Sequence, residues 1–202
     1  MTTKSRDKCY GKRVFFSFHY QDVSDFRANA VRNHWLTKSD RESAGYFDAS
    51  VWEESKKQGD VALKKLINGA LVNTSNTCIL VGSNTYERPW VRYEILKSFV
   101  RGNHILAVHI NGIKDKHQKT KALGPNPLAY VGVTYSADGK TGTLWEKIGG
   151  EWVQYNKIDG SANFSTSVDS TYRGNGYNLS NFFNVYDWIK DDGYNNFSSW
   201  LK

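Results

Sequence analysis

The sequence predicts an α/β fold in which a parallel sheet carries helices on both faces and is followed by a β-rich extension. The apolar runs at 76–83 and 104–110 are continuous rather than alternating, which is typical of strands buried on both faces of a parallel sheet. Segments with helical spacing separate the apolar runs, and this alternation favours a parallel sheet. After residue 111, turn signals and short alternating segments replace that pattern.

The first half of the predicted sheet begins with a strand at residues 13–18, RVFFSF, which ends in a polar turn. A helix is expected from Asp22, which is a suitable N-cap residue. Its core-facing stripe is predicted to hold Val23, Phe26, Ala30 and His34. A short second strand is predicted at 45–49, GYFDA.

The second half begins with the clearest helix, at residues 59–71, and continues with strands at 76–83 and 104–110. The residues of this helix that face one way are Leu63, Leu66, Ile67, Ala70 and Leu71. Another helix opens near Pro89, because proline suits the first turn of a helix. It presents Val91, Ile95 and Phe99 to the core.

The extension is predicted to contain a small β-hairpin or meander at 130–155, where ADGK and IGGE mark turns. Residues 156–181 are rich in Ser, Asn and Gly and indicate a long loop. A final short helix is expected at 182–192, with Val185, Trp188 and Ile189 packing inward. We therefore expect an N-terminal tail at 1–12, an α/β core at 13–111, and an extension at 112–202 that packs on the core.

Composition limits the classes of function. The 202 residues carry a formal net charge of +7, but the basic residues are scattered and no nucleic-acid-binding motif accompanies them, so we expect no nucleic-acid partner. Two distant cysteines, Cys9 and Cys78, suit a reducing compartment, and a cytoplasmic location is expected. No apolar run reaches the length of a membrane span, so no membrane association is expected.

Parallel α/β sheets bind ligands at the carboxyl ends of their strands. The motifs of dinucleotide-binding Rossmann folds, P-loop ATPases, α/β-hydrolases and zinc sites are missing from this sequence. We therefore expect neither a metal site nor a bound cofactor. What remains near the strand ends is the stretch WVRYE at 90–94, whose i,i+4 spacing places Trp90 above Glu94 on one helix face.

A single carboxylate beside an aromatic residue suits a particular bond cleavage. Glycoside cleavage normally uses two carboxylates, one of which protonates the leaving group. An N-glycoside with a cationic leaving group, such as the nicotinamide–ribose bond of NAD+, needs no acid, and one ionised Glu can stabilise the positive charge at the anomeric carbon. The pattern does not select this chemistry by itself. Glu94 also suits an exposed position near a helix start, and Trp90 also suits a core.

Two segments resemble conserved boxes of TIR domains. RVFFSFHYQD (13–22) resembles their first box, and GSNTYERPWVRYEI (82–95) resembles their segment from the third strand into the helix with a WxxxE pair. Over most of its length the chain is similar to the TIR-like proteins of the bacterial Thoeris antiphage system, in the stretches KRVFFSFHYQDV, RNHW, FDAS, LINGAL, WVRYEI, GPNP and DDGYNNFSSW. This resemblance implies a flavodoxin-like, TIR-like fold for residues 13–111.

The resemblance also implies an activity: an NAD+-consuming enzyme that, on sensing a phage component, makes a cyclic ADP-ribose isomer or a related signal. That signal would activate a partner effector protein, which then depletes NAD+. Glu94 takes the position of the catalytic glutamate and Trp90 that of the paired aromatic, while Ser17, Phe18 and His19 occupy the substrate-contacting box. Self-association is left open, because DASVWEESKKQGD (48–60) replaces the loop that assembles many TIR adaptors.

Two further residues are candidates for substrate contact, each beside a structural alternative. Asp48 ends the predicted second strand and is either a turn former or a ribose or nicotinamide contact. Ser83 is either a turn residue or a contact. Arg92 is expected to point to solvent. The aromatic content of 130–202, namely Tyr135, Trp145 and Trp152, suggests a lid that excludes water during cyclisation.

Two other classes of function remain alternatives at this stage. A TIR-like adaptor without enzymatic activity would use the same surfaces for protein contacts, and Glu94→Gln would leave its function intact. A nucleoside deoxyribosyltransferase-like enzyme, also α/β with a catalytic Glu, would accept free nucleosides.

Overall fold

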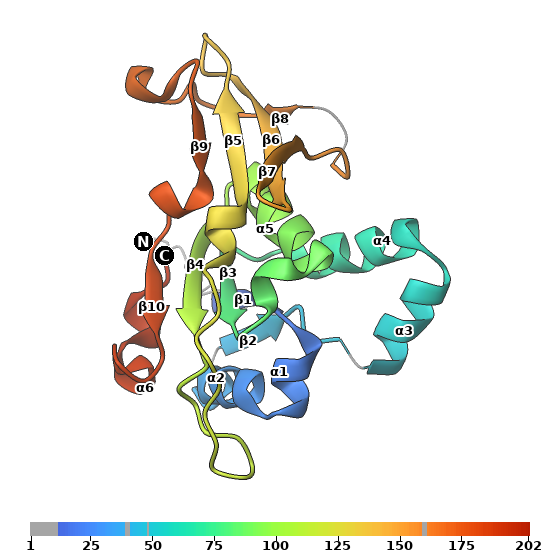
Figure 1. Cartoon of the computed structure of the whole chain (residues 1–202), viewed down its shortest axis with the longest axis vertical. Helices are drawn as coiled ribbons and strands as arrows, with labels where there is room; N and C mark the ends of the chain where they lie inside the picture. Colours follow the sequence, from blue (N-terminus) through green and yellow to red (C-terminus); the bar gives the residue numbers. More distant parts are fainter. Residues whose placement is uncertain (1–11, 39–40, 48, 159–160) are drawn as a thin grey trace, which may run out of the picture.

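The computed structural model describes residues 12–38, 41–47, 49–158 and 161–202 (Figure 1). It contains a five-stranded parallel sheet in the order β10-β4-β3-β1-β2. These strands are β1 Lys12–Phe18, β2 Arg41–Ala44, β3 Asn76–Val81, β4 His104–His109 and β10 Val185–Asp187. The prediction of a parallel α/β sheet is confirmed.

The second strand lies at 41–44 and not at 45–49, so that prediction is wrong by about one strand length. The reason is Gly45, which adopts φ +84, a left-handed conformation that ends the strand. A Cβ at this position would lie 2.2 Å from the carbonyl oxygen of Phe16, so only glycine fits against β1 here.

The helices cover both faces of the sheet, as expected. They are α1 Tyr20–Ser24, α2 Arg27–Leu36, α3 Ala49–Lys57, α4 Asp60–Leu71, α5 Pro89–Arg101 and α6 Gly193–Asn196. The 3₁₀ turns are η1 Thr85–Glu87, η2 Pro127–Tyr130, η3 Ser170–Tyr172, η4 Leu179–Asn181 and η5 Phe197–Ser199. Side chains of α4 and α5 pack on one face of the sheet, and α2 packs on the other with the C-terminal segment.

The predicted single helix from Asp22 is in fact two helices. The chain breaks at Phe26, whose φ of 67 is left-handed and whose side chain is 55% exposed. The buried face of α2 is therefore offset by one residue from the predicted stripe and consists of Arg27, Ala28, Val31 and Trp35. The face predicted for α4 is closer to the structure, since Leu63, Ile67 and Leu71 are its buried residues.

A second, antiparallel sheet lies beyond α5 in the order β7-β6-β5-β9, with β8 paired to β6 (Figure 1). Its strands are β5 Val131–Tyr135, β6 Thr141–Ile148, β7 Glu151–Gln154, β8 Ala162–Asn163 and β9 Gly176–Asn178. The predicted meander at 130–155 is confirmed. The long loop predicted at 156–181 is wrong as a description, because it contains β8, β9 and two 3₁₀ turns. These elements surround Tyr135 with the rings of Phe164, Tyr172, Tyr177 and Phe182.

The helix predicted at 182–192 is also wrong. This stretch forms β10, the edge strand of the parallel sheet, followed by a turn, and the short helix α6 comes after it. Trp188 is buried as expected, but Val185 and Ile189 are exposed. Lys202 is held at the start of β3, where the Asn76 side chain exchanges two hydrogen bonds with the Lys202 backbone. The division at residue 111 stays a prediction, and the extension contributes β10 to the core sheet.

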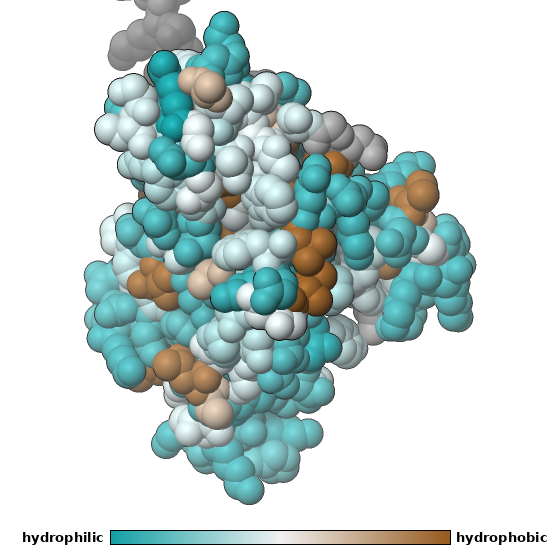
Figure 2. Space-filling view, turned by 45° about the horizontal axis from the view of Figure 1, so that its top comes forward, coloured by the Kyte–Doolittle hydropathy of each residue, from teal (hydrophilic) through white to brown (hydrophobic). Residues whose placement is uncertain are grey.

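On the face shown in Figure 2, hydrophobic surface is confined to small separate patches among hydrophilic side chains. In the part of the chain that the structure describes, no helix is both long and apolar enough to cross a membrane.

Candidate active site

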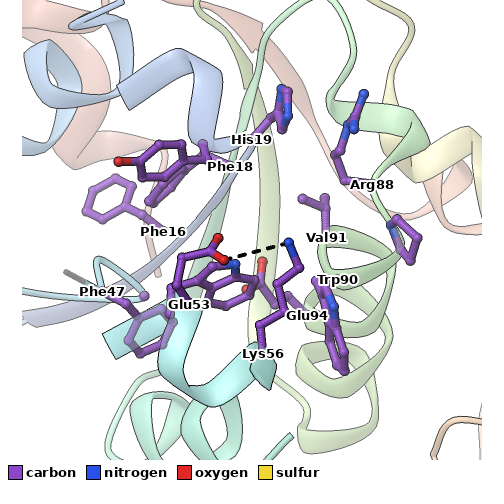
Figure 3. A pocket seen from close by; sticks show the side chains of 14 residues that line it. Phe16, Phe18, His19, Phe47, Glu53, Lys56, Arg88, Trp90, Val91 and Glu94 are labelled. Atoms are coloured by element: carbon purple, nitrogen blue, oxygen red, sulfur yellow. Dashed lines mark ion pairs between the residues drawn. The ribbon is translucent and has the colours of Figure 1, made fainter. Parts of the chain in front are cut away.

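A cavity of about 410 Å³ lies between the carboxyl end of β1, the start of α5 and helix α3 (Figure 3). Its aromatic lining residues are Phe16, Phe18, Tyr20, Phe47, Trp52 and Trp90. Its ionisable lining residues are His19, Glu53, Lys56, Arg88 and Glu94. The volume is near the lower end of the range of roughly 300–1,000 Å³ that small-molecule sites occupy.

Glu94 is held in the cavity by helix α5, which starts at Pro89 and packs Val91 and Ile95 into the core. The Glu94 side chain is only 5% exposed, and its Oε2 accepts a hydrogen bond of 2.5 Å from the Ser17 hydroxyl on β1. Burial raises the pKa of Glu94 to about 8, while the hydrogen bond from Ser17 acts in the opposite direction. The carboxyl group is therefore poised to change charge near neutral pH.

Trp90 forms one wall of the cavity, one helical turn before Glu94. Its ring packs edge-on against Tyr93 at a centroid distance of 5.6 Å. The ammonium group of Lys157, from the extension, lies 5.4 Å from the centroid of the Trp90 ring. The predicted alternatives of core residue and pocket wall are thus both partly realised, because Trp90 is half-buried and still lines the cavity.

Phe18 and His19 also line the cavity, at the end of β1. The Phe18 ring is fixed against Tyr46 at a centroid distance of 4.3 Å. Burial, and then the nearby charge of Arg88, lower the pKa of His19, so that its imidazole is neutral at physiological pH. Neither ring nitrogen of His19 hydrogen-bonds to another residue in the described part of the chain.

The structure does not bring every predicted residue to the cavity. Ser17 does not line the cavity but hydrogen-bonds to Glu94, and Ser83 is not among the lining residues either. The Ser83 hydroxyl donates to the carbonyl of Ala122 at 2.7 Å. Asp48 lies outside the described residues. Arg92 was expected in solvent, and this is wrong: it is 9% exposed and forms an ion pair of 3.1 Å with Glu146 on β6.

Two comparisons place this chain among known proteins. Residues 15–115 match the family model described as "Thoeris protein ThsB, TIR-like domain". A protein of Bacillus cereus (strain MSX-D12), named "Putative cyclic ADP-D-ribose synthase ThsB1", is 55% identical over 190 residues, which cover 94% of this chain and 98% of that protein. The chain belongs to the ThsB family of TIR-like proteins.

Every described residue that lines the cavity falls inside the segment matched by the ThsB family model. This segment includes residues that the sequence analysis missed, among them Trp52, Glu53 and Lys56 on α3. No helix is predicted above for the stretch SVWEESKK (50–57), although its i,i+3 and i,i+4 spacings of charges and Trp52 are a helical signal. Glu53 and Lys56 form an ion pair of 3.9 Å at the cavity (Figure 3).

The extension beyond the ThsB family segment contributes none of the lining residues that the structure describes. The aromatic lid expected from Tyr135, Trp145 and Trp152 is therefore not placed over the cavity. Trp145 and Trp152 line a separate groove of about 350 Å³ on the antiparallel sheet, and Tyr135 belongs to the ring cluster beneath that sheet. Helix α3, through Trp52, Glu53 and Lys56, covers part of the cavity instead.

Across residues 12–38, 41–47, 49–158 and 161–202, no group of three His, Cys, Asp or Glu side chains is arranged to hold a metal ion. What the described cavity offers to chemistry is one buried carboxyl group, aromatic walls and several cationic or neutral donors at its edge.

Proposed function

We propose that this ThsB-family protein cleaves NAD+ at the nicotinamide–ribose bond and converts the remainder into a cyclic ADP-ribose isomer that serves as a signal. NAD+ is the substrate, and the proposal needs no metal or resident cofactor. The observation that carries it is the buried carboxyl group of Glu94, fixed by Ser17 inside an aromatic-walled cavity. The name of the B. cereus relative supports the same activity.

The first step breaks the bond between the anomeric carbon of the nicotinamide ribose and the ring nitrogen of nicotinamide. The bonding electron pair leaves with the nitrogen, so nicotinamide departs as a neutral molecule and no proton is required. Positive charge develops at the anomeric carbon, and ionised Glu94 stabilises it. A cationic nicotinamide ring in the cavity also favours the ionised form of a carboxyl group whose pKa is about 8 in the free protein.

The second step joins the anomeric carbon to a hydroxyl oxygen or a ring nitrogen of the same molecule. If a hydroxyl group attacks, its proton is released, and a carboxylate with a raised pKa is a suitable acceptor. Water must be kept away, because it would give linear ADP-ribose instead. The aromatic side chains of Phe18, Trp52 and Trp90 around the carboxyl group support this exclusion.

The roles of the other residues follow from their positions. We assign Trp90 and Phe18 to the walls that hold the nicotinamide ribose, and His19 to a polar contact at the edge. Ser17 orients Glu94 and favours its ionised form. Substrate contacts by Ser83 and Asp48 stay predictions.

We also propose the partners that the Thoeris resemblance implies. A phage component triggers the enzyme, and the product passes to a separate effector protein that then depletes NAD+. The coupling between the two proteins is thus a small molecule and not a protein–protein interface.

The test uses cells that carry the effector and are challenged with phage. Small molecules are extracted from cells with the unaltered protein, with Glu94→Gln, and with the control Glu151→Gln, whose carboxylate is exposed on β7. We expect a species with the mass of cyclic ADP-ribose, found by mass spectrometry, in the unaltered and Glu151→Gln cells only. Glu94→Gln should lower its amount on the order of 10²–10³-fold, the loss typical of removing a group that stabilises transition-state charge.

One outcome would contradict the enzymatic proposal. If Glu94→Gln cells stay protected from phage and none of the cells contains the species, the protein signals by contact, as an adaptor does. A test with free nucleosides as substrates separates the cyclase from a deoxyribosyltransferase-like enzyme.

A further inference from the structure

The edge of the cavity opposite α3 carries two nitrogen-rich side chains that the cleavage step does not use. Figure 3 shows the ring of His19 and the guanidinium group of Arg88 at the same end of the cavity, away from Glu53 and Lys56. NAD+ carries two negative charges on its diphosphate, so a site that binds it needs groups of this kind. This inference therefore rests on the proposed function.

Arg88 is free to serve such a ligand. It is the residue immediately before α5, and its Nε donates to the carbonyl of Asn84 at 3.2 Å, which fixes the stem of the side chain. Its only ion pair among the described residues is with Glu87, at 3.7 Å, and both side chains are well exposed. Exposed pairs of this kind contribute little, on the order of 0–1 kcal/mol, so a phosphate can replace Glu87.

His19 complements Arg88 as a neutral donor. The neutral imidazole carries one N–H group that can donate to a phosphate oxygen, and neither ring nitrogen is hydrogen-bonded to another described residue. Asp22, the acidic group close to His19, is occupied by an ion pair of 3.0 Å with Lys121. Lys121 also pairs with Asp25, so it offsets part of the negative charge beside His19.

The other cation of the cavity, Lys56, lies at its α3 end, away from Arg88 and His19. Lys56 lies on α3 and pairs with Glu53, so this pair adds no net charge. The first turn of α5, which begins at the Arg88 end, contains no acidic residue, so the partial positive charge of the helix N-terminus adds to that of Arg88. A guanidinium group also matches the geometry of a phosphate through two parallel hydrogen bonds.

We propose that Arg88 and His19 form a clamp for the diphosphate of NAD+, at the edge of the cavity away from α3. The nicotinamide ribose then extends inward to Glu94, and the adenosine half lies at the open end. The clamp would make the site selective for dinucleotides over nicotinamide nucleosides. It would also hold the adenosine half close enough to return to the anomeric carbon for cyclisation.

The test measures dissociation constants by calorimetry with the full-length Glu94→Gln protein, which prevents turnover. Three probes are compared: NAD+, ADP-ribose, and nicotinamide riboside, which has no phosphate. Arg88→Ala should weaken NAD+ and ADP-ribose about ten- to a hundredfold, the value of a charge-assisted hydrogen bond, and leave nicotinamide riboside within about twofold. Arg88→Lys should restore part of the affinity, and His19→Ala should weaken the phosphate-bearing probes about three- to tenfold.

The matched control is Arg101→Ala, at the opposite end of α5, where the side chain donates to the carbonyl of Leu71. It should bind all three probes like the parent. The clamp is refuted if Arg88→Ala weakens nicotinamide riboside as much as NAD+, or weakens neither. If Arg88→Ala has no effect while phage-challenged cells still make the cyclic product, only the clamp fails. If NAD+ does not bind the Glu94→Gln protein and no product forms, the clamp and the proposed function fail together.

Discussion

The two sheets of this protein differ in what they bury. The parallel sheet and its helices enclose a cavity with a carboxyl group that is 5% exposed, and all the described lining residues come from 16–94. The antiparallel sheet buries a cluster of aromatic rings around Tyr135. The proposed chemistry therefore belongs to the first sheet, and the second sheet packs as a support against the helix that carries Glu94.

The two regions meet at α5 through specific contacts. Arg92 pairs with Glu146 on β6, and Lys157 lies over the ring of Trp90. Arg92 is placed between Trp90 and Glu94 in the sequence, so the extension contacts the same two helical turns that form the site. The comparison of the two sheets shows that an element outside a cavity can still determine the position of the side chains that form its walls.

The largest expected effect comes from deleting residues 184–202. This change removes strand β10 from the parallel sheet, together with four buried side chains, which are Trp188, Phe197, Trp200 and Leu201. Each large apolar side chain of this kind contributes about 2–5 kcal/mol, so the four together are comparable to the whole of the roughly 5–15 kcal/mol that stabilises a typical domain. We expect the truncated chain to show no cooperative thermal unfolding by circular dichroism.

The control for this deletion is Ile189→Ala, which alters an exposed side chain of the same segment and should leave the unfolding temperature nearly unchanged. A truncated chain that still unfolds cooperatively would show that the region before residue 184 is stable by itself. Residues 184–202 would then be dispensable for folding, and the core would depend less on the extension than the structure indicates.

The second prediction concerns Glu146→Ala, which leaves the guanidinium group of Arg92 without its ion-pair partner. Removing one member of a buried pair costs about 3–5 kcal/mol, and slightly less is expected here because both side chains keep some exposure. We expect urea unfolding to report a loss of about 2–3 kcal/mol. The double variant Arg92→Met with Glu146→Leu should regain most of that loss, because no unpaired charge remains. Equal stability of all three proteins would mean that the two sheets are energetically independent at this contact.

These contacts also mark how far the sequence alone could lead. Local patterns were sufficient for β3 and β4, whose continuous apolar runs admit no exposed face, and for α5, where Pro89 and the WVRYE spacing located Glu94. Local patterns failed where contacts with a distant segment determine the secondary structure or the burial of a residue. The stretch around Val185 is a strand because β4 offers an unpaired edge, and Arg92 is buried because Glu146 lies 54 residues later in the chain. The α3 side of the cavity was missed for a different reason: most residues of α3 are polar, so its helical signal lies in the spacing of charges and Trp52 and not in a run of apolar residues.

The third prediction uses the charge of Glu94. The proposed cleavage needs ionised Glu94, and a pKa of about 8 means that this carboxyl group is mostly protonated in the free protein at pH 7. We expect kcat/KM for NAD+ to rise with pH through about 8, so that its value at pH 7 is about a tenth of the plateau. Ser17→Ala removes the hydrogen bond that favours the ionised form and should move this rise to higher pH. The measurement is kcat/KM of the activated enzyme as a function of pH. If Ser17→Ala does not shift the pH at which kcat/KM rises, Glu94 is not the group whose ionisation controls cleavage.

The same carboxyl group predicts an effect on stability. Because its pKa is higher in the folded than in the unfolded state, Glu94 costs no stability below about pH 4.5, and its cost grows as the pH rises towards 8. Glu94→Gln should therefore raise the unfolding temperature at pH 9, by roughly 5 °C or more, and change it little at pH 4.5. An equal change at both pH values would show that the substitution acts through packing and not through charge.

The smallest expected effect tests whether the extension takes any part in binding. Lys157→Ala removes a cation from the ring of Trp90, an interaction that contributes about 0.5–1 kcal/mol at a partly exposed site. We expect KM for NAD+ to rise by about two- to fivefold with kcat unchanged, and the control Lys140→Ala, on an exposed turn of the extension, to leave both constants as they are. A sheet that only packs against α5 can change how firmly a wall of the cavity is held but not the proposed bond cleavage itself. If Lys157→Ala lowered kcat strongly, or changed the ratio of cyclic to linear product, the extension would be part of the chemistry and the division of labour between the two sheets would be wrong.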